Sequence, residues 1–345
     1  MSDKNYGRTI IAERAFNTKR FFLRWEWMLV VLLVIINIYN SINAPGYWGT
    51  GLLTYGVRDF MDKAIMVFPM MLVLLLGEID VSVASTMALS CVIMGMVYGE
   101  GSTGVPMWAA ILAGLFIGAV CGFINGLILV AFKELSSVIV TISTMIIFRG
   151  IAQILLETRS SGKFASWFQY LNYGQVGIIP FDIIFFAIET IIFAYVIHKT
   201  PFGRRVYAMG SNITTARYSG INTGGIKLLI FTLNGLFAAV AGMFAASKMS
   251  SVLPSMAKNY ELDVISMVVL GGVSTLGGKG NVLGVVLATF AVGMIRYGLG
   301  LAGVNSQTIL VIVGLMLIIA VSVPNFKKTF GESALIKKFS KSKLA

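Results

Sequence analysis

The stretch GEIDVSVAS, residues 77–85, places two acidic side chains, Glu78 and Asp80, between two apolar runs. The run before it is MVFPMMLVLLL at 66–76, and the run after it is MALSCVIMGMVYG at 87–99. Both runs favour the interior of a bilayer, where an ionised carboxylate is costly unless it has a partner. The presence of two carboxylates at this position therefore needs a structural or a functional explanation.

The composition of the whole chain is that of an integral membrane protein. Of its 345 residues, 57% are hydrophobic and only 12% are charged, and the mean hydropathy is +0.85. A soluble domain of this length could not bury so much apolar surface, whereas a helix of about 20 apolar residues crosses the ~30 Å hydrocarbon core of a bilayer. The predicted fold class is an all-α polytopic integral membrane protein.

Ten segments have the hydropathy expected of transmembrane helices. They are 26–44, 62–77, 83–99, 106–131, 135–156, 178–197, 226–247, 261–276, 281–299 and 305–323. The 261–276 segment is short and begins with Glu261 and Asp263, so we expect a partial or re-entrant helix that lines a cavity instead of facing lipid. Whether 77–85 and 261–284 belong to full spans or to re-entrant segments stays open at this point.

The distribution of basic residues predicts the orientation, because Lys and Arg near span ends stay cytoplasmic. With the N-terminus inside, nineteen of the 27 Lys and Arg residues fall in inner segments and six in outer ones. Both termini are then cytoplasmic. The predicted organisation is an N-terminal tail at 1–25, a transmembrane domain at 26–325 with a cytoplasmic loop at about 199–226, and a basic tail at 326–345.

The same distribution explains the net charge of +12 without a nucleic-acid partner. Basic residues on inner loops meet anionic lipid headgroups, and the sequence has no basic and aromatic platform for bases. The first apolar run is long enough to stay in the membrane, so we expect a multi-pass protein of the cell inner membrane without a cleaved signal.

The sequence offers little for catalysis or metal binding. His198 is the single histidine and ends a span, while Cys91 and Cys121 lie in different expected helices at no metal-ligand spacing. The glycine-rich stretch at 271–284 fails as a nucleotide loop, because its lysine is followed by glycine instead of Ser or Thr. We therefore expect no enzymatic activity, no metal and no cofactor bound by this chain.

Glycine recurs at every fourth position of AGLFIGAVCGFING, residues 113–126. Such a stripe of small residues lets another helix approach closely. The four positions are Gly114, Gly118, Gly122 and Gly126. We expect them to serve helix packing inside the chain, with a subunit interface as the alternative.

Polar side chains in or beside the spans are candidates for a solute pathway or gate. They are Glu78, Asp80, Ser82, Asn125, Thr141, Thr144, Arg149, Gln153 and Asn234. A path for a hydroxylated solute needs such groups, because a sugar gives up many hydrogen bonds with water when it enters a dry site. The alternative for each residue is a hydrogen bond to a neighbouring helix.

Two of these residues carry more specific predictions. Asp80 is placed to cap a helix that begins around Val81, with Ser82 and Ser85 assisting. Arg149 is expected to pair with Glu157 or to extend its charge towards the outer interface.

The opening stretch also closely resembles the GEIDLSVGS-type signature of membrane permeases in the ribose/xylose/rhamnose branch of ABC sugar importers. Three further stretches agree in order: SSVIVTISTMIIFRGI at 136–151, TPFGRRVYAMGSNITTARYSGI at 200–221 and ELDVISMVVLGGVSTLGGKGNVLG at 261–284. The resemblance covers roughly residues 25 to 325. RWEW, DKAIMVFPM, GRRVYA and MVVLGGVSTLGG look most like rhamnose-type permeases, with autoinducer-sugar permeases as near relatives. Ala84 and Lys279 are mild departures from the pattern.

The resemblance implies a division of labour among subunits. Two permease chains, identical or paired with a sister subunit, would form the pathway for a sugar, and an extracytoplasmic binding protein would deliver it. ABC ATPase subunits carrying ATP and Mg would drive transport from the cytoplasm. By motif match, the ATPase-coupling residues would be Gly210, Asn212, Ala216, Arg217, Tyr218 and Gly220; without the resemblance, 200–221 reads as an ordinary basic inner loop.

Two other mechanistic classes compete with this interpretation. An ion-coupled secondary transporter of a small polar solute would need charged residues in mid-span, for which Glu189 and Arg149 are the main candidates. An intramembrane enzyme would need a nucleophile and base or a metal site, which one histidine and two separated cysteines do not supply.

Overall fold

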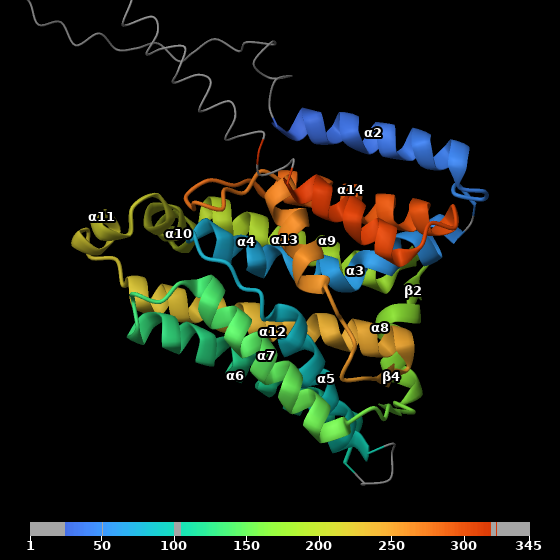
Figure 1. Cartoon of the computed structure of the whole chain (residues 1–345), viewed down its shortest axis with the longest axis horizontal. Helices are drawn as coiled ribbons and strands as arrows, with labels where there is room; N and C mark the ends of the chain where they lie inside the picture. The colour runs from blue at the N-terminus through green and yellow to red at the C-terminus, as the bar shows by residue number, and fades with distance from the viewer. Residues whose placement is uncertain (1–24, 50, 100–104, 319–321, 323–345) are drawn as a thin grey trace, which may run out of the picture.

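The computed structural model describes residues 25–49, 51–99, 105–318 and 322 (Figure 1). The predicted tails at 1–25 and 326–345 lie outside these residues, except for Trp25. Within the described part, six helices are long and apolar enough to cross a membrane: α2 (Trp25–Asn43), α6 (Met107–Ala131), α7 (Ser137–Leu156), α9 (Phe181–Lys199), α12 (Thr223–Met249) and α14 (Val282–Leu301). They correspond to six of the ten predicted spans.

Shorter elements connect and complete these helices. The helical ones are η1 (Leu52–Val57), α3 (Arg58–Ala64), α4 (Val67–Leu75), α5 (Val83–Tyr98), η3 (Ser166–Gln169), α8 (Tyr170–Tyr173), α10 (Pro201–Ser211), α11 (Ile213–Tyr218), α13 (Tyr260–Leu270) and Ser306–Ile318. Strand β1 (Ser161–Gly162) pairs antiparallel with β4 (Ser251–Val252), and β2 (Gln175–Val176) pairs antiparallel with β3 (Ile179–Pro180). The all-α polytopic fold class is confirmed.

Two predicted spans are shorter or more broken than the hydropathy indicates. The 62–77 segment is not one helix, because a turn at Ile65 and Met66 separates α3 from α4. The 261–276 segment contains α13, whose 11 residues rise only about 16 Å at 1.5 Å each and cannot cross a bilayer. The expectation of a partial helix at 261–276 therefore matches the structure, and the single span at 62–77 was wrong.

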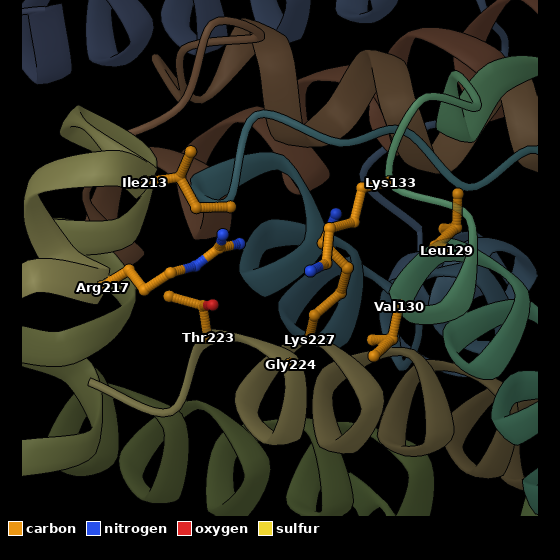
Figure 2. Close-up of a pocket in the computed structure, with 8 residues that line it drawn as sticks. All are labelled: Leu129, Val130, Lys133, Ile213, Arg217, Thr223, Gly224 and Lys227. Carbon is orange, nitrogen blue, oxygen red and sulfur yellow. The ribbon is translucent and has the colours of Figure 1, made fainter. Parts of the chain in front are cut away.

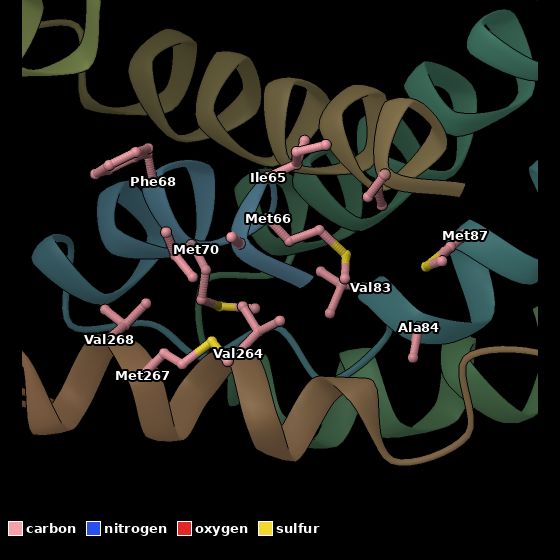
Figure 3. Packing of buried hydrophobic residues seen from close by; sticks show 14 of the residues in the cluster. Ile65, Met66, Phe68, Met70, Val83, Ala84, Met87, Val264, Met267 and Val268 are labelled. Atoms are coloured by element: carbon pink, nitrogen blue, oxygen red, sulfur yellow. The ribbon is translucent and has the colours of Figure 1, made fainter. Parts of the chain in front are cut away.

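Two of the short helices, α4 and α13, lie in the middle of the molecule. In Figure 1, α2 and α14 run along one side, α5, α6, α7 and α12 along the other, and α4 and α13 lie between them. All nine residues of α4 are buried. Figure 3 shows Met70 of α4 on the side that faces Val264 and Met267 of α13, whereas Phe68 lies on the other side of α4. A helix that is apolar all round packs inside protein, which explains how elements too short to span are accommodated.

The glycine stripe of α6 is covered by helices of the same chain. A Cβ atom at Gly122 would lie 2.2 Å from the carbonyl oxygen of Phe231, and one at Gly118 would lie 2.6 Å from that of Gly235, both on α12. Gly114 faces the Ser90 carbonyl of α5 in the same way, at 3.1 Å. This face is therefore occupied by α5 and α12 and is not free for a second subunit. Gly126 completes the stripe against Leu228 of α12, at 3.1 Å from its Cα atom.

Candidate functional site

The GEIDVSVAS stretch forms an irregular segment between α4 and α5. The chain leaves α4 through Gly77, whose φ of +78° is a conformation that residues with a side chain rarely adopt. A Cβ at Gly77 would also lie 3.2 Å from the carbonyl oxygen of Leu276. The segment then continues to Val83, where α5 begins. It places Glu78 and Asp80 outside any helix.

Asp80 is the centre of a buried polar network that joins this segment to α6 and α12. Its Oδ1 accepts hydrogen bonds from the backbone N–H and from Oγ of Ser82, at 2.9 and 2.7 Å. Its Oδ2 accepts from Nδ2 of Asn234 at 2.8 Å, and Nδ2 of Asn125 donates to Ser82 Oγ at 2.8 Å. Asp80 is only 2% exposed, so these donors take the place of water around its carboxylate.

The prediction that Asp80 caps the following helix was wrong, because the N-cap residue of α5 is Ser82 and it has no side-chain cap hydrogen bond. Helix α5 begins at Val83 and not around Val81, and Asp80 holds the N–H of Ser82, the residue just before the helix. Ser85 does not cap the helix, because its Oγ donates to the carbonyl oxygen of Ser82 at 2.7 Å. The carboxylate thus fixes the start of α5 from one turn further back.

Helix α7 satisfies the backbone of the same segment from the other side. The N–H of Ile79 donates to Ser137 Oγ at 3.1 Å, and the N–H of Val81 donates to Thr141 Oγ1 at 3.2 Å. Backbone groups inside a membrane protein need such partners. Thr144 instead donates to the Thr141 carbonyl within its own helix, at 3.2 Å. Thr141 therefore belongs to the network, and Thr144 does not.

Two other pathway candidates lie elsewhere. Arg149 does not pair with Glu157, because its Nη1 donates to the carbonyl oxygens of Pro254 and Met256, both at 2.7 Å. Glu157 instead pairs with Arg159 at 3.1 Å on the surface. The predicted pairing was wrong because carbonyls 105 and 107 residues away are better placed. Gln153 is exposed on α7 and does not reach the Asp80 network.

Glu78 forms an ion pair with Lys227 in the first part of α12. Lys227 also lines a cavity of about 310 Å³ with Lys133 and with Arg217 of α11 (Figure 2). In Figure 2 the side chains of Lys133 and Lys227 lie next to each other, and Arg217 extends into the cavity from the opposite wall. The remaining lining residues are Leu129, Val130, Ile213, Thr223 and Gly224. Because Lys227 is already paired with Glu78, Lys133 and Arg217 are the lining cations that a partner carrying negative charge would meet.

Helix α10 contacts the end of α4 and the glycine-rich loop through the backbone. A Cβ at Gly210 would lie 1.8 Å from the Leu75 carbonyl oxygen, so only glycine fits there. That same oxygen accepts a hydrogen bond from the N–H of Gly278 at 2.9 Å. Tyr207 of α10 donates to the carbonyl oxygen of Gly280 at 2.8 Å. Movement of α10 would thus reach the irregular segment at 76–82 directly.

Helix α11 presents part of the predicted coupling surface. Asn212 caps it, with Oδ1 accepting from the N–H of Thr215 at 2.9 Å. Tyr218 is 89% exposed and Arg217 is also exposed, whereas Ala216 is buried. Gly220 has a φ of +80° and open space around it. Ala216 therefore supports this surface from below and does not face a partner, contrary to the motif-based expectation.

A second group of charged residues was missed by the sequence analysis. Asp263 of α13 pairs with Lys63 of α3 at 3.1 Å and with Arg296 of α14, and Lys248 at the end of α12 pairs with Asp59 at 2.9 Å. The charged run RDFMDK at 58–63 was the available signal. No specific role was assigned to these side chains from the sequence, because nothing local indicates that they turn inward.

The described residues contain no group of three or more His, Cys, Asp or Glu side chains placed to hold a metal ion. Cys91 and Cys121 are buried free thiols. Glu189 is buried in α9, and neither of its carboxylate oxygens has a hydrogen-bond partner among the described residues. Phe186 and Phe193, one turn before and one turn after it, both stack on Phe68. Glu189 is therefore the residue on which an ion-coupled mechanism would depend.

A family model described as "Branched-chain amino acid transport system / permease component" matches residues 52–321. The chain belongs to this permease family. It is thus a multi-pass membrane permease component of an ABC importer and not an enzyme. The family-level resemblance drawn from the four motifs is confirmed.

Curated relatives match this permease along most of their length. Ribose import permease protein RbsC of Escherichia coli (strain K12) is 31% identical, over 92% of this chain and 98% of that protein. RbsC of Bacillus subtilis (strain 168) is 36% identical over 85% and 89%. Autoinducer 2 import system permease protein LsrD of Escherichia coli O9:H4 (strain HS) is 32% identical over 86% and 91%. No solved structure matches the chain.

Proposed function

We propose that this permease is the membrane-spanning subunit of an ATP-driven importer that carries a sugar. The observation that carries the proposal is the similarity, over 92% of the chain, to a ribose import permease. A relative named for autoinducer 2 import points to the same class of small hydroxylated solute. A rhamnose-like sugar, favoured by the local motifs, stays a prediction from the sequence.

The proposed ATPase partner would dock on the surface formed by α10 and α11. Arg217, Tyr218 and Gly220 are open to solvent there, and the cavity beside them carries Lys133. Acidic side chains on the partner would complement these cations. ATP and Mg would be bound by that partner. The basic loop at about 199–226 would then be cytoplasmic, in agreement with the orientation from Lys and Arg.

The remaining proposed partners complete a transporter. A second permease chain, identical or a sister subunit, would share the pathway, and an extracytoplasmic sugar-binding protein would deliver the solute. Membrane lipids would surround the long helices. The sugar itself shifts the balance between inward- and outward-facing states only through its different affinity for each.

The geometry supports a specific route for coupling. Docking of the ATPase would move α10, whose Gly210 touches the Leu75 carbonyl at the end of α4. The segment that follows holds Glu78 and Asp80, which bind α12 through Lys227 and Asn234. We therefore propose Glu78, Asp80 and their partners as the inner gate, positioned between the ATPase surface and the membrane helices.

The test is affinity purification of the full-length permease from detergent-solubilised native membranes, followed by mass spectrometry. An ATPase subunit should copurify and should be lost when Arg217 and Gly220 are replaced together by Glu and Val. Arg159→Glu, on a surface away from α11, is the matched control and should retain the ATPase. A stable permease that purifies without any ATPase would overturn the proposal.

The ion-coupled alternative had two candidate residues, Arg149 and Glu189. Arg149 donates to two backbone carbonyls, so this alternative now depends on Glu189, whose carboxylate oxygens have no hydrogen-bond partner among the described residues. Uptake measured during inhibition of the ATPase, with ion gradients intact, separates the two mechanisms. Loss of uptake supports the importer, and continued uptake supports the secondary transporter.

A further inference from the structure

A second cavity lies at the far end of α12 from the cavity of Figure 2. Helix α12 has Lys227 in its first two turns and Lys248 in its last turn, and its 27 residues rise about 40 Å at 1.5 Å each. The cavity at the Lys248 end has a volume of about 320 Å³. It is built from three tyrosines, a charged pair, an arginine and an asparagine: Tyr55, Tyr173, Tyr297, Asp59, Lys248, Arg58 and Asn172. If the Lys227 end is cytoplasmic, this cavity is on the outer side.

Arg58 gives this cavity a buried hydrogen-bond donor that lacks a partner. The side chain lines the cavity and the residue is only 6% exposed, yet among the described residues neither Nε nor Nη2 has a hydrogen-bond partner. The nearest carboxylate oxygen, Oδ2 of Asp182, lies 3.8 Å from Nε, which is too far for a hydrogen bond. That oxygen is also buried and without a hydrogen bond. A hydroxyl oxygen in the cavity would give the buried guanidinium of Arg58 an acceptor that it lacks.

The charges of the cavity favour a neutral ligand. Asp59 is paired with Lys248 at 2.9 Å, and the Arg58 charge is balanced by Asp182. No net charge is therefore left to select an anion or a cation. The volume is at the lower end of the range of about 300–1,000 Å³ typical of small-molecule pockets.

The aromatic walls favour a flat ligand with polar edges. Tyr173 and Tyr297 present rings with hydroxyl groups, and the Arg58 guanidinium lies 5.9 Å from the centre of the Tyr173 ring. An amphipathic ring offers an apolar face and a polar tip. A sugar matches this lining, because its C–H faces are apolar and its edge carries hydroxyls.

We propose that this cavity binds a neutral monosaccharide-sized polyol on the outer side of the permease, with Arg58 as its main hydrogen-bond donor. The proposal rests on the sugar-import function proposed above and adds a site within a single chain. It places the solute at the opposite end of α12 from the Glu78 and Lys227 pair.

The first experiment uses thiol labelling, because Cys91 and Cys121 are buried. Tyr173→Cys puts a thiol on the cavity wall, and Tyr170→Cys, on the same short helix but not in the lining, is its control. Both are expressed as full-length permease in intact cells and treated with a membrane-impermeant maleimide. D-ribose and autoinducer 2 are the probes, with L-leucine, a zwitterion that is not a polyol, as the comparison.

The expected result is that one of the two sugars slows labelling of Tyr173→Cys and leaves labelling of Tyr170→Cys unchanged. Protection by L-leucine alone would overturn a site for neutral polyols. Absence of protection by the sugar that the wild-type permease imports would overturn the site, while leaving the importer function intact. Copurification of the ATPase, measured on the same cells, reports that function separately.

The second experiment replaces Arg58 with Lys, which keeps the charge and removes the planar fork of donors. The sugar concentration for half-maximal uptake should rise about tenfold or more, because hydrogen bonds to a charged donor are lost. The maximal rate and ATPase copurification should change little. Arg159→Lys, on the exposed surface, is the control. An unchanged half-maximal concentration in Arg58→Lys would contradict the proposal.

Discussion

The carboxylate of Asp80 joins two parts of the membrane domain through different oxygens. Oδ1 accepts from Ser82 at the start of α5, and Oδ2 accepts from Asn234 of α12. Both oxygens therefore face donors. A side-chain amide at this position would have to turn its NH₂ group towards one of them, because it has a single acceptor oxygen.

Asp80→Asn should accordingly lower both stability and uptake. One buried donor is left unsatisfied, which costs about 1–3 kcal/mol. The measurements are thermal unfolding in detergent and uptake per permease molecule in the membrane. Adding Asn234→Asp returns an acceptor opposite the new amide and should recover part of the loss. Normal uptake at normal expression would remove the gating role and leave only a structural role at the helix start.

Arg149 provides a second prediction at this scale. Arg149→Gln should destabilise the permease by about 1.5–3 kcal/mol, because two hydrogen bonds from a charged donor to the chain before α13 are lost. Thermal unfolding of the purified full-length chain measures this change. Arg159→Gln is the matched control and should shift stability by less than about 1 kcal/mol, since its pair with Glu157 is exposed. Equal effects of the two variants would contradict the assignment.

A substitution at Glu189 distinguishes the ATP-driven mechanism from the ion-coupled one. Glu189→Gln keeps the shape of the side chain and removes its ionisable proton, and in an ATP-driven importer uptake should stay within about twofold of wild type, since no step needs that proton. Uptake is measured with and without a proton-gradient uncoupler while ATP is maintained. Loss of uptake in Glu189→Gln, together with inhibition of the wild type by the uncoupler, would favour ion coupling.

Most polar residues of the network were identified from the sequence, but Ser137 and the pairing of all of them were not. Asp80, Ser82, Asn125, Thr141 and Asn234 stand out because polar groups are rare inside spans. Their convergence depends on how closely α6 approaches α12, which the glycine contacts between those helices set. Such a contact between distant parts of the chain leaves no local signature. The same holds for Arg149, whose acceptors lie over 100 residues away.

At the scale of elements, α10 is fixed to the irregular segment by backbone contact. Gly210 packs on the Leu75 carbonyl, which also accepts from Gly278. The end of α4, helix α10 and the glycine-rich loop thus meet where there is no room for a side chain. Pro201 begins α10 directly after α9 ends at Lys199, but the sequence could not indicate what α10 touches.

Gly210→Ala tests this junction. The added methyl would lie 1.8 Å from the Leu75 oxygen, so α10 must move away. Overpacking of this kind costs about 1–3 kcal/mol. We expect uptake to fall while the ATPase still copurifies, because the α11 surface is untouched. Gly150→Ala on α7, where nothing lies within 4 Å of the new methyl, is the control and should behave as wild type. Normal uptake in Gly210→Ala would argue against coupling through this contact.

Element boundaries were predictable where length and hydropathy agree. Long helices such as α6 and α12 were anticipated within a few residues. The turn at Ile65 and Met66 was not, because the run from 64 to 76 is apolar throughout and periodicity cannot show a break in a helix buried on all sides. For α13, the acidic residues Glu261 and Asp263 near its start indicated a partial helix, which hydropathy alone did not.

At the scale of the whole molecule, α12 connects the two polar ends of the permease. Near its first turn Lys227 holds Glu78, and in its last turn Lys248 holds Asp59 beside the outer cavity. Midway, Asn234 holds Asp80. A displacement at the proposed ATPase surface would therefore reach the proposed sugar cavity through this one helix. With the orientation predicted from Lys and Arg, this transmission would run from the cytoplasmic side outwards.

Reversal of the Glu78 and Lys227 pair tests transmission across the molecule. Lys227→Glu places two carboxylates together, so the segment at 76–82 should separate from α12. The ATPase should still copurify and hydrolyse ATP, because Arg217 and Tyr218 are unchanged, while uptake per ATP hydrolysed should fall about tenfold or more, equivalent to about 1.4 kcal/mol. Both rates are measured in proteoliposomes containing the complete transporter. The double variant Glu78→Lys with Lys227→Glu restores opposite charges and should recover most of the coupling. Two results would contradict this role: a parallel fall of hydrolysis and uptake in the single variant, or a double variant that couples no better than the single one. The pair would then serve assembly, and α12 would not transmit movement through it.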